Sequence, residues 1–528
     1  MNVLLAAQQQ QVTAWPQRLA LTVVVVAVTA LAVWGMWRSW HKRAAVDLPV
    51  QNPPSGFTAD MQIPGRYVGT APATDWMQRV VANGMGAPGN AVAKIRAGQP
   101  LFPGILGYED TVLPQLEHAV LAGHDVIFLG ERGQAKTRMI RQLTDLLDEW
   151  MPIVEGSEIN DDPYNPVSAH ARQLVEGMGD DTPISWVHRS ERFGEKLATP
   201  DTSIADLIGE VDPIKVAEGR YLSDELTLHY GLVPRTNRGI FAINELPDLM
   251  EKIQVGLFNL MEERDVQIRG FKIRLPLDVL IVASANPEDY TSRGRIITPL
   301  KDRFGAQIRT HYPKTIEAEI AIVEQEVPSQ ERCGRPVRVP DFMKQIVAQL
   351  TFEARKSPDV NQSSGVSVRV SLNNYETLIA NAERRAVKLG EQEIVPRICD
   401  LQATASSMLG KVEFEYGGED RDEAPPFDRL LNRAVLAIFD RSVPLDRLKK
   451  VIEYFEGGWG VEVSDMMRAE EYLEGVRAIP GLREAIAELG SFESPALMAA
   501  ATEFVLEGLH LHRKLNKDRE GGRSTYRA

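Results

Sequence analysis

The residue types that bind phosphate groups occur together in one run of eight, Gly130-Glu131-Arg132-Gly133-Gln134-Ala135-Lys136-Thr137. This run joins the apolar segment 126–129 to a segment of helical spacing at 137–147. A glycine-rich turn between a strand and a helix lets backbone N–H groups point at a triphosphate, and the positive end of the helix faces the same charge. We expect Lys136 to contact the β- and γ-phosphates and the Thr137 hydroxyl to bind Mg²⁺. The sequence therefore predicts ATP and Mg²⁺ as ligands.

The loop departs from the usual phosphate-binding pattern at one position, where Ala135 replaces the last glycine. An alanine can follow the same turn if its φ stays negative, but its methyl group leaves less room for a phosphate. The alternative interpretation is an ordinary glycine turn that caps a helix. The strand and helix expected on either side of the loop favour the phosphate site.

Polar residues also follow two further apolar runs, at 239–243 and 279–283. The first run ends in Asn244 and Glu245, and the second in Ser284, Ala285 and Asn286. Both runs have the length and composition of buried parallel strands. Ligands of an open parallel sheet lie beyond the carboxyl ends of its strands, so we expect these residues to share a crevice with the loop.

Asn244 and Glu245 occupy the place of a Walker B element, in which an acid on the metal side precedes a catalytic glutamate. Asn244 offers a neutral oxygen instead, so Mg²⁺ must rely on Thr137 and on the phosphates, and we expect a weaker affinity for the metal. Glu245 is placed to orient and polarise the attacking water. Alternatively, Glu245 stabilises a helix at 246–263 through the helix dipole, an effect of about 0.3–1 kcal/mol.

The elements that must position these residues alternate between β and α from about residue 101. We expect helices at 113–121, 137–150 and 248–263, strands at 125–129 and 184–187, and a β-hairpin at 266–274. This order predicts an α/β fold of the P-loop NTPase type, a parallel sheet with helices on both faces. Helical patterns follow at 316–409 and 427–515, and the tail after Arg513 is too polar to be ordered.

The composition limits the function classes. The chain has 528 residues, of which 44% are hydrophobic and 25% charged, values typical of a globular protein with about three domains. Its formal charge of −14 argues against a nucleic-acid partner, which needs a basic surface. The two cysteines, Cys333 and Cys399, form no CxxC pair, so neither a disulfide framework nor a structural zinc site is expected. A reducing cytoplasm fits this usage.

An uncharged, apolar segment at 19–37 is long enough to cross a bilayer as a helix. Arg38, Lys42 and Arg43 follow it, whereas only Arg18 precedes it closely. This bias predicts a transmembrane anchor with the rest of the chain in the cytoplasm, at the inner face of the membrane. A secretory signal is the alternative, but the segment lacks a basic start and a small-residue cleavage site.

Together these motifs resemble the AAA+ ATPases of the magnesium-chelatase ATPase-subunit and MoxR-type group. The resemblance covers about 101–409 and depends on the runs 130–137, 238–245, 285–289 and 299–304. It implies that Asn286 is sensor 1, which contacts the γ-phosphate or the lytic water. It also implies that Arg303 is an arginine finger for a neighbouring subunit, so that catalysis needs a ring, expected to be a hexamer.

Three weaker assignments follow from the same resemblance. Arg369 is similar to the sensor 2 arginine of the lid, with a surface ion pair as the alternative. The segments 216–237 and 266–274 are similar to the helix-2 insert and the pre-sensor-1 hairpin, which project toward a partner, although ordinary surface loops explain them as well. The resemblance divides its own range into an AAA+ core at 101–314 and a helical lid at 315–410. Composition and pattern divide the rest into an N-terminal segment at 1–43, a small region at 44–100, an acidic linker at 411–426 and a helical region at 427–528.

The resemblance implies an ATP-hydrolysing ring protein that remodels a partner, as a chaperone does. The implied partner carries a von Willebrand A-type domain, and the outcome is metal insertion or the assembly of a cofactor-containing enzyme. A second hypothesis is a scaffold that binds ATP but hydrolyses it poorly, for which Asn244 is the evidence. Residues 1–100 lie outside the resemblance, so a fused segment or a misplaced start is a further interpretation of that part.

Overall fold

The computed structural model describes residues 86–211, 227–267, 274–286, 295–328, 331–361, 365–414, 425–520 and 523–528. The predicted membrane helix at 19–37 and most of the region at 44–100 lie outside these residues. Within the described ranges, no helix is both long and apolar enough to cross a membrane.

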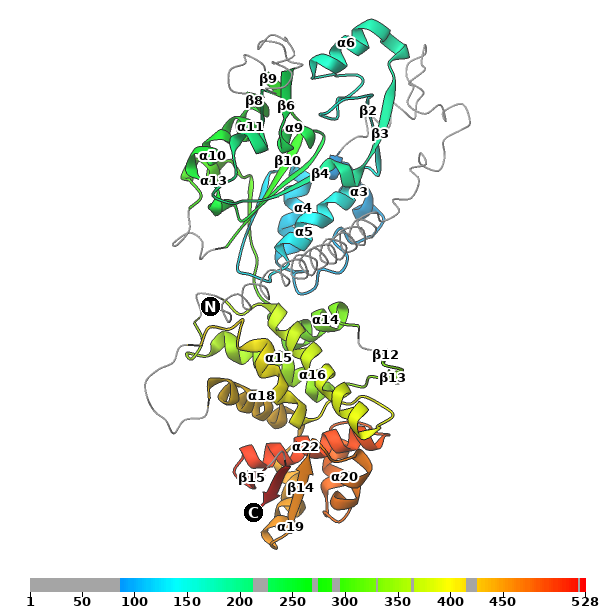
Figure 1. Cartoon of the computed structure of the whole chain (residues 1–528), viewed down its shortest axis with the longest axis vertical. Helices are drawn as coiled ribbons and strands as arrows, with labels where there is room; N and C mark the ends of the chain where they lie inside the picture. The colour runs from blue at the N-terminus through cyan, green and yellow to red at the C-terminus, as the bar shows by residue number, and fades with distance from the viewer. Residues whose placement is uncertain are drawn as a thin grey trace, which may run out of the picture. The chain divides into compact units, whose positions relative to one another are not determined.

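Five parallel strands form the central sheet in the order β11-β1-β10-β7-β4. This arrangement confirms the predicted parallel sheet. Figure 1 labels two of its strands, β10 and β4. The strands are β1 (Val126–Leu129), β4 (Phe193–Leu197), β7 (Gly239–Asn244), β10 (Val279–Ala285) and β11 (Ala306–Arg309). The three central strands are the apolar runs noted in the sequence, and their backbone groups pair on both sides, as a buried strand requires.

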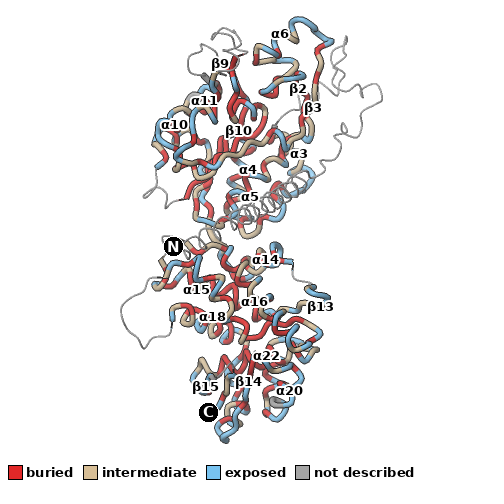
Figure 2. Tube along the Cα trace, in the orientation of Figure 1, coloured by how far each residue is buried: buried red, intermediate tan, exposed pale blue. Residues whose placement is uncertain are grey.

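Two hydrophobic clusters cover the two faces of this sheet, because successive side chains of a strand point to opposite faces. On β7, Ile240 and Ala242 pack into one cluster, and Phe241 and Ile243 pack into the other. Figure 2 shows that the neighbouring strand β10 is buried along most of its trace. The first cluster includes residues of α3 (Gly86–Arg96), α4 (Val112–Ala122) and α5 (Lys136–Gln142). The second includes residues of α10 (Glu251–Gly256), α11 (Phe258–Glu262) and α13 (Thr298–Arg303). The predicted placement of helices on both faces is therefore confirmed.

Several boundaries differ from the prediction. The helix expected at 137–150 ends at Gln142 and continues as the 3-10 helix η2 (Leu143–Leu146), and Trp150 already begins a strand. That strand, β2 (Trp150–Val154), pairs antiparallel with β3 (Ile184–His188). The expected strand at 184–187 therefore exists, but its place in the parallel sheet was wrong. Met151, Ile153 and Val187 form a small hydrophobic cluster of this strand pair, separate from the clusters that cover the main sheet.

The helix expected at 248–263 is broken into the 3-10 helix η6 (Leu246–Asp248), α10 and α11. The predicted hairpin exists as the antiparallel pair β8 (Asp265–Gln267) and β9 (Arg274–Pro276), with its tip outside the described residues. Of the expected helix-2 insert at 216–237, residues 216–226 also lie outside them. The short antiparallel pair β5 (Gly209–Val211) and β6 (Leu228–Tyr230) flanks that segment.

The remaining elements of the first half are short. They are α6 (Ala169–Met178), η3 (Gly179–Asp181), η4 (Arg189–Arg192), α7 (Ile204–Leu207) and α9 (Leu232–Arg235). The second half is mainly helical. Its elements are α14 (Ile316–Glu326), β12 (Glu331–Arg332), β13 (Arg335–Pro336), α15 (Asp341–Lys356), α16 (Val368–Leu389), η8 (Ile398–Thr404), α17 (Ala405–Met408), α18 (Pro426–Ser442), η9 (Leu445–Leu448), α19 (Lys449–Glu456), α20 (Ala469–Val476), α21 (Leu482–Glu488) and α22 (Pro495–Leu511).

The expectation of a disordered tail after Arg513 was wrong. β15 (Asn516–Glu520) and β16 (Arg523–Arg527) pair antiparallel, and β16 also pairs with β14 (Gly460–Ser464). Tyr526 is buried in a hydrophobic cluster that extends along the chain from Ile316, and its hydroxyl donates to Glu507. The predicted lid and the C-terminal region thus share one core.

Candidate functional site

The loop 130–137 turns sharply between β1 and α5, and three of its residues show why. The N–H of Gly130 donates to the carbonyl of Ala285 at 3.1 Å, and a Cβ on Gly130 would collide with the Thr310 hydroxyl. Gly133 has a φ of 74°, which suits glycine. Ala135 has a φ of 55°, so the negative φ at which alanine would follow this turn without strain is not adopted. The loop therefore holds an alanine in a conformation that costs about 1 kcal/mol for residues with a Cβ.

Lys136 and Asn286 meet at the carboxyl ends of β1 and β10. The Nζ atom of Lys136 lies 2.8 Å from Oδ1 of Asn286, and it also donates to the carbonyls of Glu131, at 2.7 Å, and Gly130. Both side chains are buried, with 7% and 4% of their residue surfaces exposed. The structure thus brings together the lysine and the sensor 1 candidate, which the sequence placed 150 residues apart.

The end of β7 lies beside the same strand. Oδ1 of Asn244 accepts from the Ser284 hydroxyl at 3.3 Å, and the Ser284 hydroxyl also accepts from the backbone N–H of Glu245 at 3.3 Å. On its other side, Nδ2 of Asn244 donates to Oε1 of Glu195 on β4 at 2.6 Å. Glu195 in turn pairs with Arg141 of α5, whose Nε lies 3.0 Å from Oε2. Asn244 is therefore part of a polar chain that links three strands and α5.

Glu245 has a φ of 55°, an unusual conformation for a residue with a side chain. Strained backbone of this kind occurs often at functional sites, where the surrounding structure holds it. The alternative role of Glu245 was to stabilise a long helix at 246–263. Only the three-residue 3-10 helix η6 directly follows Glu245, because the backbone of Leu249 and Met250 is not helical. The helix-dipole alternative is thereby removed, and the role of the Glu245 carboxylate at the crevice stays a prediction.

Magnesium suits the donors at this crevice, because it prefers oxygen ligands and keeps several of them from phosphates and water. The Thr137 hydroxyl at the start of α5 is exposed, and Oδ1 of Asn244 faces away from Glu195. Among the described residues, no group of three His, Cys, Asp or Glu side chains could hold a metal by itself. The residues that would hold Mg²⁺ are thus Thr137 and Asn244, together with the nucleotide.

Arg303 makes its described contacts away from the loop. Its guanidinium pairs with Glu262 of α11, where Nε lies 3.1 Å from Oε2, and Nη1 donates to the Pro299 carbonyl at 2.8 Å. The same group lies over the ring of Phe258, 4.8 Å from its centroid. The structure therefore does not bring Arg303 to the phosphate loop of its own chain. This placement leaves its role as a finger for a neighbouring subunit as a prediction.

The start of α16 packs directly against the phosphate loop. Ser367 caps this helix by accepting from the N–H of Arg369 at 3.1 Å, and a Cβ on Gly133 would collide with the Ser367 hydroxyl. The Tyr312 hydroxyl donates to the Arg132 carbonyl at 3.1 Å nearby. Arg369 itself is exposed at the second position of the helix. The structure thus places the sensor 2 candidate two residues from a side chain that touches the loop.

A cavity of about 400 Å³ lies beside the loop. Its wall includes Gly130, Gln134 and Thr310, and the Thr310 hydroxyl donates to Oε1 of Gln134 at 2.6 Å. The Tyr108 hydroxyl donates to the carbonyls of Gln134, at 3.0 Å, and His311, at 2.7 Å. Burial raises the pKa of Tyr108, so its hydroxyl keeps its proton and remains a donor. These bonds hold the middle of the loop.

Sequence reasoning missed Glu195, Arg141 and Thr310. Glu195 lies in Phe193–Leu197, a strand that contains a glycine and two charged residues and therefore shows no apolar run. Arg141 lies in α5, whose C-terminal end was predicted only approximately, and Thr310 directly follows β11, which was not predicted. The motif order alone could not show that β4 and β11 flank the three predicted strands.

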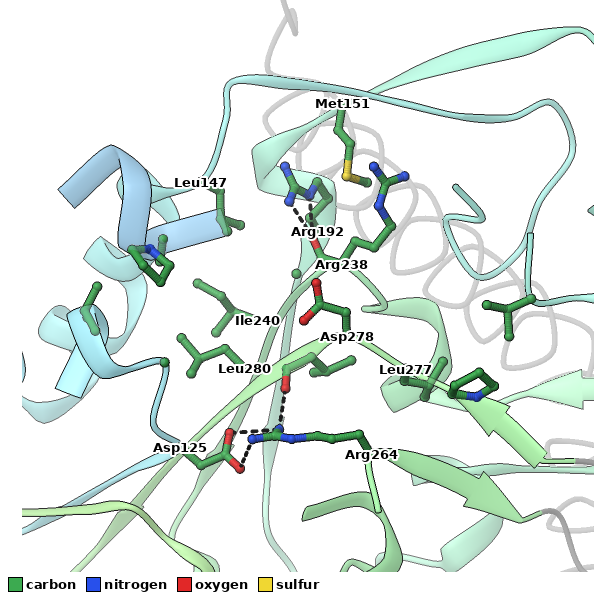
Figure 3. Close-up of a pocket in the computed structure, with 18 of the residues that line it drawn as sticks. Asp125, Leu147, Met151, Arg192, Arg238, Ile240, Arg264, Leu277, Asp278 and Leu280 are labelled. Carbon is green, nitrogen blue, oxygen red and sulfur yellow. Dashed lines mark hydrogen bonds and ion pairs between the residues drawn. The ribbon is translucent and has the colours of Figure 1, made fainter. Parts of the chain in front are cut away.

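A larger cavity, of about 690 Å³, lies at the opposite ends of the strands (Figure 3). Arg192 donates to the Arg238 carbonyl, and Arg264 pairs with Asp125 at 3.0 Å. Burial lowers the pKa of Arg192 to about 10, which still leaves it charged at neutral pH. The carbonyl groups and Asp125 therefore compensate these cations, and the cavity is remote from the predicted phosphate site.

No protein-family model matches the chain. The magnesium-chelatase subunit ChlI of Nostoc sp. is 30% identical over 232 residues, which are 42% of this chain and 58% of that protein. The predicted resemblance to the magnesium-chelatase ATPase subunits is confirmed. A second magnesium-chelatase relative, the 38 kDa subunit of Rhodobacter capsulatus, is 28% identical over 251 residues, 45% of this chain and 63% of that protein. The chain therefore spans about three fifths of the length of these magnesium-chelatase relatives.

Solved structures give weaker likenesses. A chain of the complex between subunits BchI and BchD of magnesium chelatase is 20% identical, with a TM-score of 0.33, over 62% of this chain and 98% of that chain. A putative ATPase from Cytophaga hutchinsonii is 14% identical, with a TM-score of 0.29, over 68% and 98%. Both TM-scores are too low to establish a shared fold, so the likeness to the magnesium-chelatase subunits depends on sequence.

Proposed function

We propose that this chain binds ATP with Mg²⁺, hydrolyses it as a ring, expected to be a hexamer, and uses the nucleotide cycle to remodel a partner protein. The single observation that carries the proposal is the convergence of Lys136, Asn286 and the Asn244–Glu245 pair at the carboxyl ends of three neighbouring parallel strands. The identity to magnesium-chelatase subunits supports it.

Each residue then has a separate task. Lys136 exchanges its backbone carbonyl partners for the β- and γ-phosphates, and the loop N–H groups bind the same charge. Bound Mg²⁺ would neutralise developing charge on the phosphates. Glu245 accepts a proton from, or polarises, the attacking water, and Asn286 holds that water or the γ-phosphate. Arg303 of one subunit would complete the site of the next, and Arg369 would report the γ-phosphate to the lid.

The partner and the location are further parts of the proposal. The resemblance described in the sequence analysis implies a protein with a von Willebrand A-type domain as the partner, and metal insertion or cofactor-enzyme assembly as the outcome. The charge of the chain favours a protein partner over nucleic acid. The cytoplasmic face of the membrane, with a tether at 19–37, remains the proposed location because of the basic residues that follow that segment.

The test is steady-state ATP turnover by the full chain, with Lys136→Ala and Glu245→Gln. We expect Lys136→Ala to abolish both nucleotide binding and turnover. We expect Glu245→Gln to bind ATP but to lower kcat roughly a hundredfold or more. Lys344→Ala is the matched control, because Lys344 pairs with Glu324 on the lid surface, away from the loop. Turnover that survives both site variants would refute the proposal.

A scaffold that binds ATP without hydrolysing it remains the second candidate, because Asn244 supplies no negative charge to the metal. It predicts tight ATP binding, no turnover by the unchanged chain, and no effect of Glu245→Gln on the release of phosphate. The same experiment therefore separates the two functions.

A further inference from the structure

We propose that Glu195 is a positioning residue for the magnesium ion. Glu195 lies on the strand next to Asn244 and carries the negative charge that Asn244 lacks. The inference rests on the proposed function and deepens it. Three observations carry it: the hydrogen bond between Glu195 and Asn244, the orientation that this bond imposes on the Asn244 amide, and the salt bridge between Arg141 and the Glu195 carboxylate.

Strand register brings Glu195 to Asn244. Glu195 on β4 stands opposite Ala242 on β7, and Asn244 lies two residues further along β7. Because side chains alternate between the faces of a sheet, Ala242 and Asn244 share a face, and Glu195 lies next to them on it. Oε1 of Glu195 reaches Nδ2 of Asn244 at 2.6 Å. A carboxylate is thus hydrogen-bonded directly to the residue that replaces the Walker B acid.

This hydrogen bond fixes which way the Asn244 amide points. An ionised carboxylate only accepts hydrogen bonds, so the NH₂ group of Asn244 must face Glu195. The carbonyl oxygen Oδ1 then points to the other side, where it accepts from the Ser284 hydroxyl at 3.3 Å. A carbonyl oxygen has a second lone pair, and this one is available to a cation or to a water bound to it. With a neutral partner at 195, the amide could rotate and present its NH₂ group to the metal instead.

Arg141 holds the Glu195 carboxylate in place from α5. Its Nε lies 3.0 Å from Oε2 and its Nη2 lies 3.3 Å from Oε1. Arg141 follows Thr137 by four residues on the same helix, so both lie on one face of it. The helix that brings the proposed Mg²⁺-binding hydroxyl therefore also orients the carboxylate. Glu195 is the less exposed partner, with 22% of its side chain exposed against 64% for Arg141.

The arrangement excludes a second acid at position 244. An aspartate there would put a carboxylate within hydrogen-bonding distance of Glu195 with no proton between them, and like charges at that distance oppose each other. Asn244→Asp alone should therefore fail to strengthen metal binding. A carboxylate at position 244 can therefore strengthen metal binding only if position 195 is neutral. The effects of substitutions at the two positions should not be additive.

The experiment measures how much free Mg²⁺ the full chain needs to bind a fluorescent ADP analogue, a readout independent of turnover. The variants are Glu195→Gln, Asn244→Asp and the double change, with circular dichroism to show that each is folded. Glu393→Gln is the matched control, because Glu393 is also a half-buried glutamate paired with a more exposed arginine, Arg338, but lies in the lid. Arg141→Ala is a second probe of Glu195 that replaces only an exposed side chain.

We expect Glu195→Gln to raise the half-saturating Mg²⁺ concentration roughly tenfold or more, the usual effect of losing a residue that orients a metal ligand. Arg141→Ala should raise it by less, and the control should leave it unchanged. Asn244→Asp alone should give no improvement, whereas the double variant should need roughly tenfold less Mg²⁺ than Asn244→Asp.

The inference is overturned if folded Glu195→Gln and Arg141→Ala both match the control, or if Asn244→Asp alone lowers the Mg²⁺ requirement as far as the double change does. These outcomes differ from a failure of the proposed function, in which the unchanged chain would bind no nucleotide at any Mg²⁺ concentration.

Discussion

Lys136 donates a hydrogen bond to Asn286 across the gap between β1 and β10, with 2.8 Å between Nζ and Oδ1. This contact ties the phosphate loop to the strand that carries the sensor 1 candidate. Since the amide oxygen already faces the ammonium group, a γ-phosphate bound by Lys136 would lie within reach of the same amide.

Replacement of Asn286 by alanine should separate binding from chemistry. Lys136 retains its charge and its loop, so we expect the Kd for ATP to change less than about threefold, whereas kcat falls roughly a hundredfold because a group that orients the water or the phosphate is lost. Fluorescent-nucleotide titration and phosphate release measure the two quantities. Asn361→Ala is the control, because Asn361 contacts Glu413 in the lid region. Equal losses in both quantities would show that Asn286 acts in binding instead.

Arg303 should act on the neighbouring subunit. In its own chain it pairs with Glu262, and Arg303→Ala should leave nucleotide binding intact while it lowers turnover roughly a thousandfold, as for other trans-acting arginines. When Arg303→Ala chains are mixed with Glu245→Gln chains, some interfaces should combine an intact Glu245 with an intact Arg303. We therefore expect the mixture to recover part of the turnover that each variant lacks alone. A mixture as inactive as its components would argue for a role of Arg303 within its own chain.

Ala135→Gly should stabilise the AAA+ core. Ala135 has a φ of 55°, where glycine has no steric penalty, but glycine also raises the conformational entropy of the unfolded chain, at a cost of roughly 0.4–1 kcal/mol. Relief of a strain of roughly 1–2 kcal/mol should therefore raise the free energy of unfolding by about 0.5 kcal/mol. Ala93→Gly is the matched control and should lower the free energy of unfolding. Ala93 is exposed within helix α3, where glycine costs about 1 kcal/mol. Calorimetry of the two variants compares them directly. A loss of stability in Ala135→Gly would mean that contacts of the methyl group outweigh the backbone strain.

Two buried glutamates on α22 should affect the pH dependence of stability in opposite directions. Burial alone would raise the pKa of Glu507, but the charge of Lys517 and hydrogen bonds from Lys517 and Tyr526 lower it below its usual value. Its contribution is therefore complete above the unfolded pKa of about 4.3 and is lost as the pH falls through the folded pKa. Burial raises the pKa of Glu503, so the contribution of Glu503 is complete below about pH 4.3 and is lost as the pH rises through its folded pKa.

Chemical denaturation at a series of pH values tests this pair. Glu507→Gln should make the free energy of unfolding fall less as the pH is lowered. Glu503→Gln should make it fall more, because the contribution of Glu503, which grows as the pH is lowered, is removed. The two residues lie one helical turn apart on α22, so each variant serves as the control for the other. Identical pH profiles for both variants would contradict the assignment.

The central strands could be predicted from the sequence because burial on both faces requires continuous apolar residues, as at 240–243. The edge strands β4 and β11 could not, because each has one neighbouring strand and tolerates charged residues such as Glu195 and Arg309. The loop residues were found from their spacing. Their hydrogen bonds were not, since contacts such as that between Thr310 and Gln134 depend on strand order.

Two local features could not be read from the sequence, for physical reasons. Alanine intrinsically prefers a negative φ, but the surrounding loop overrides that preference and holds Ala135 at a φ of 55°. The C-terminal tail was expected to be disordered because of its polarity, but a short antiparallel sheet needs only one apolar face, and Tyr526 supplies its buried anchor.

The hydrophobic cluster from Ile316 to Tyr526 has a mechanical consequence. Close-packed interiors have low compressibility and transmit strain, so a rotation of α16 at Ser367 should carry α22 and the terminal sheet with it. Because Ser367 touches the phosphate loop at Gly133, a change in the loop should therefore move the last hundred residues together with the lid.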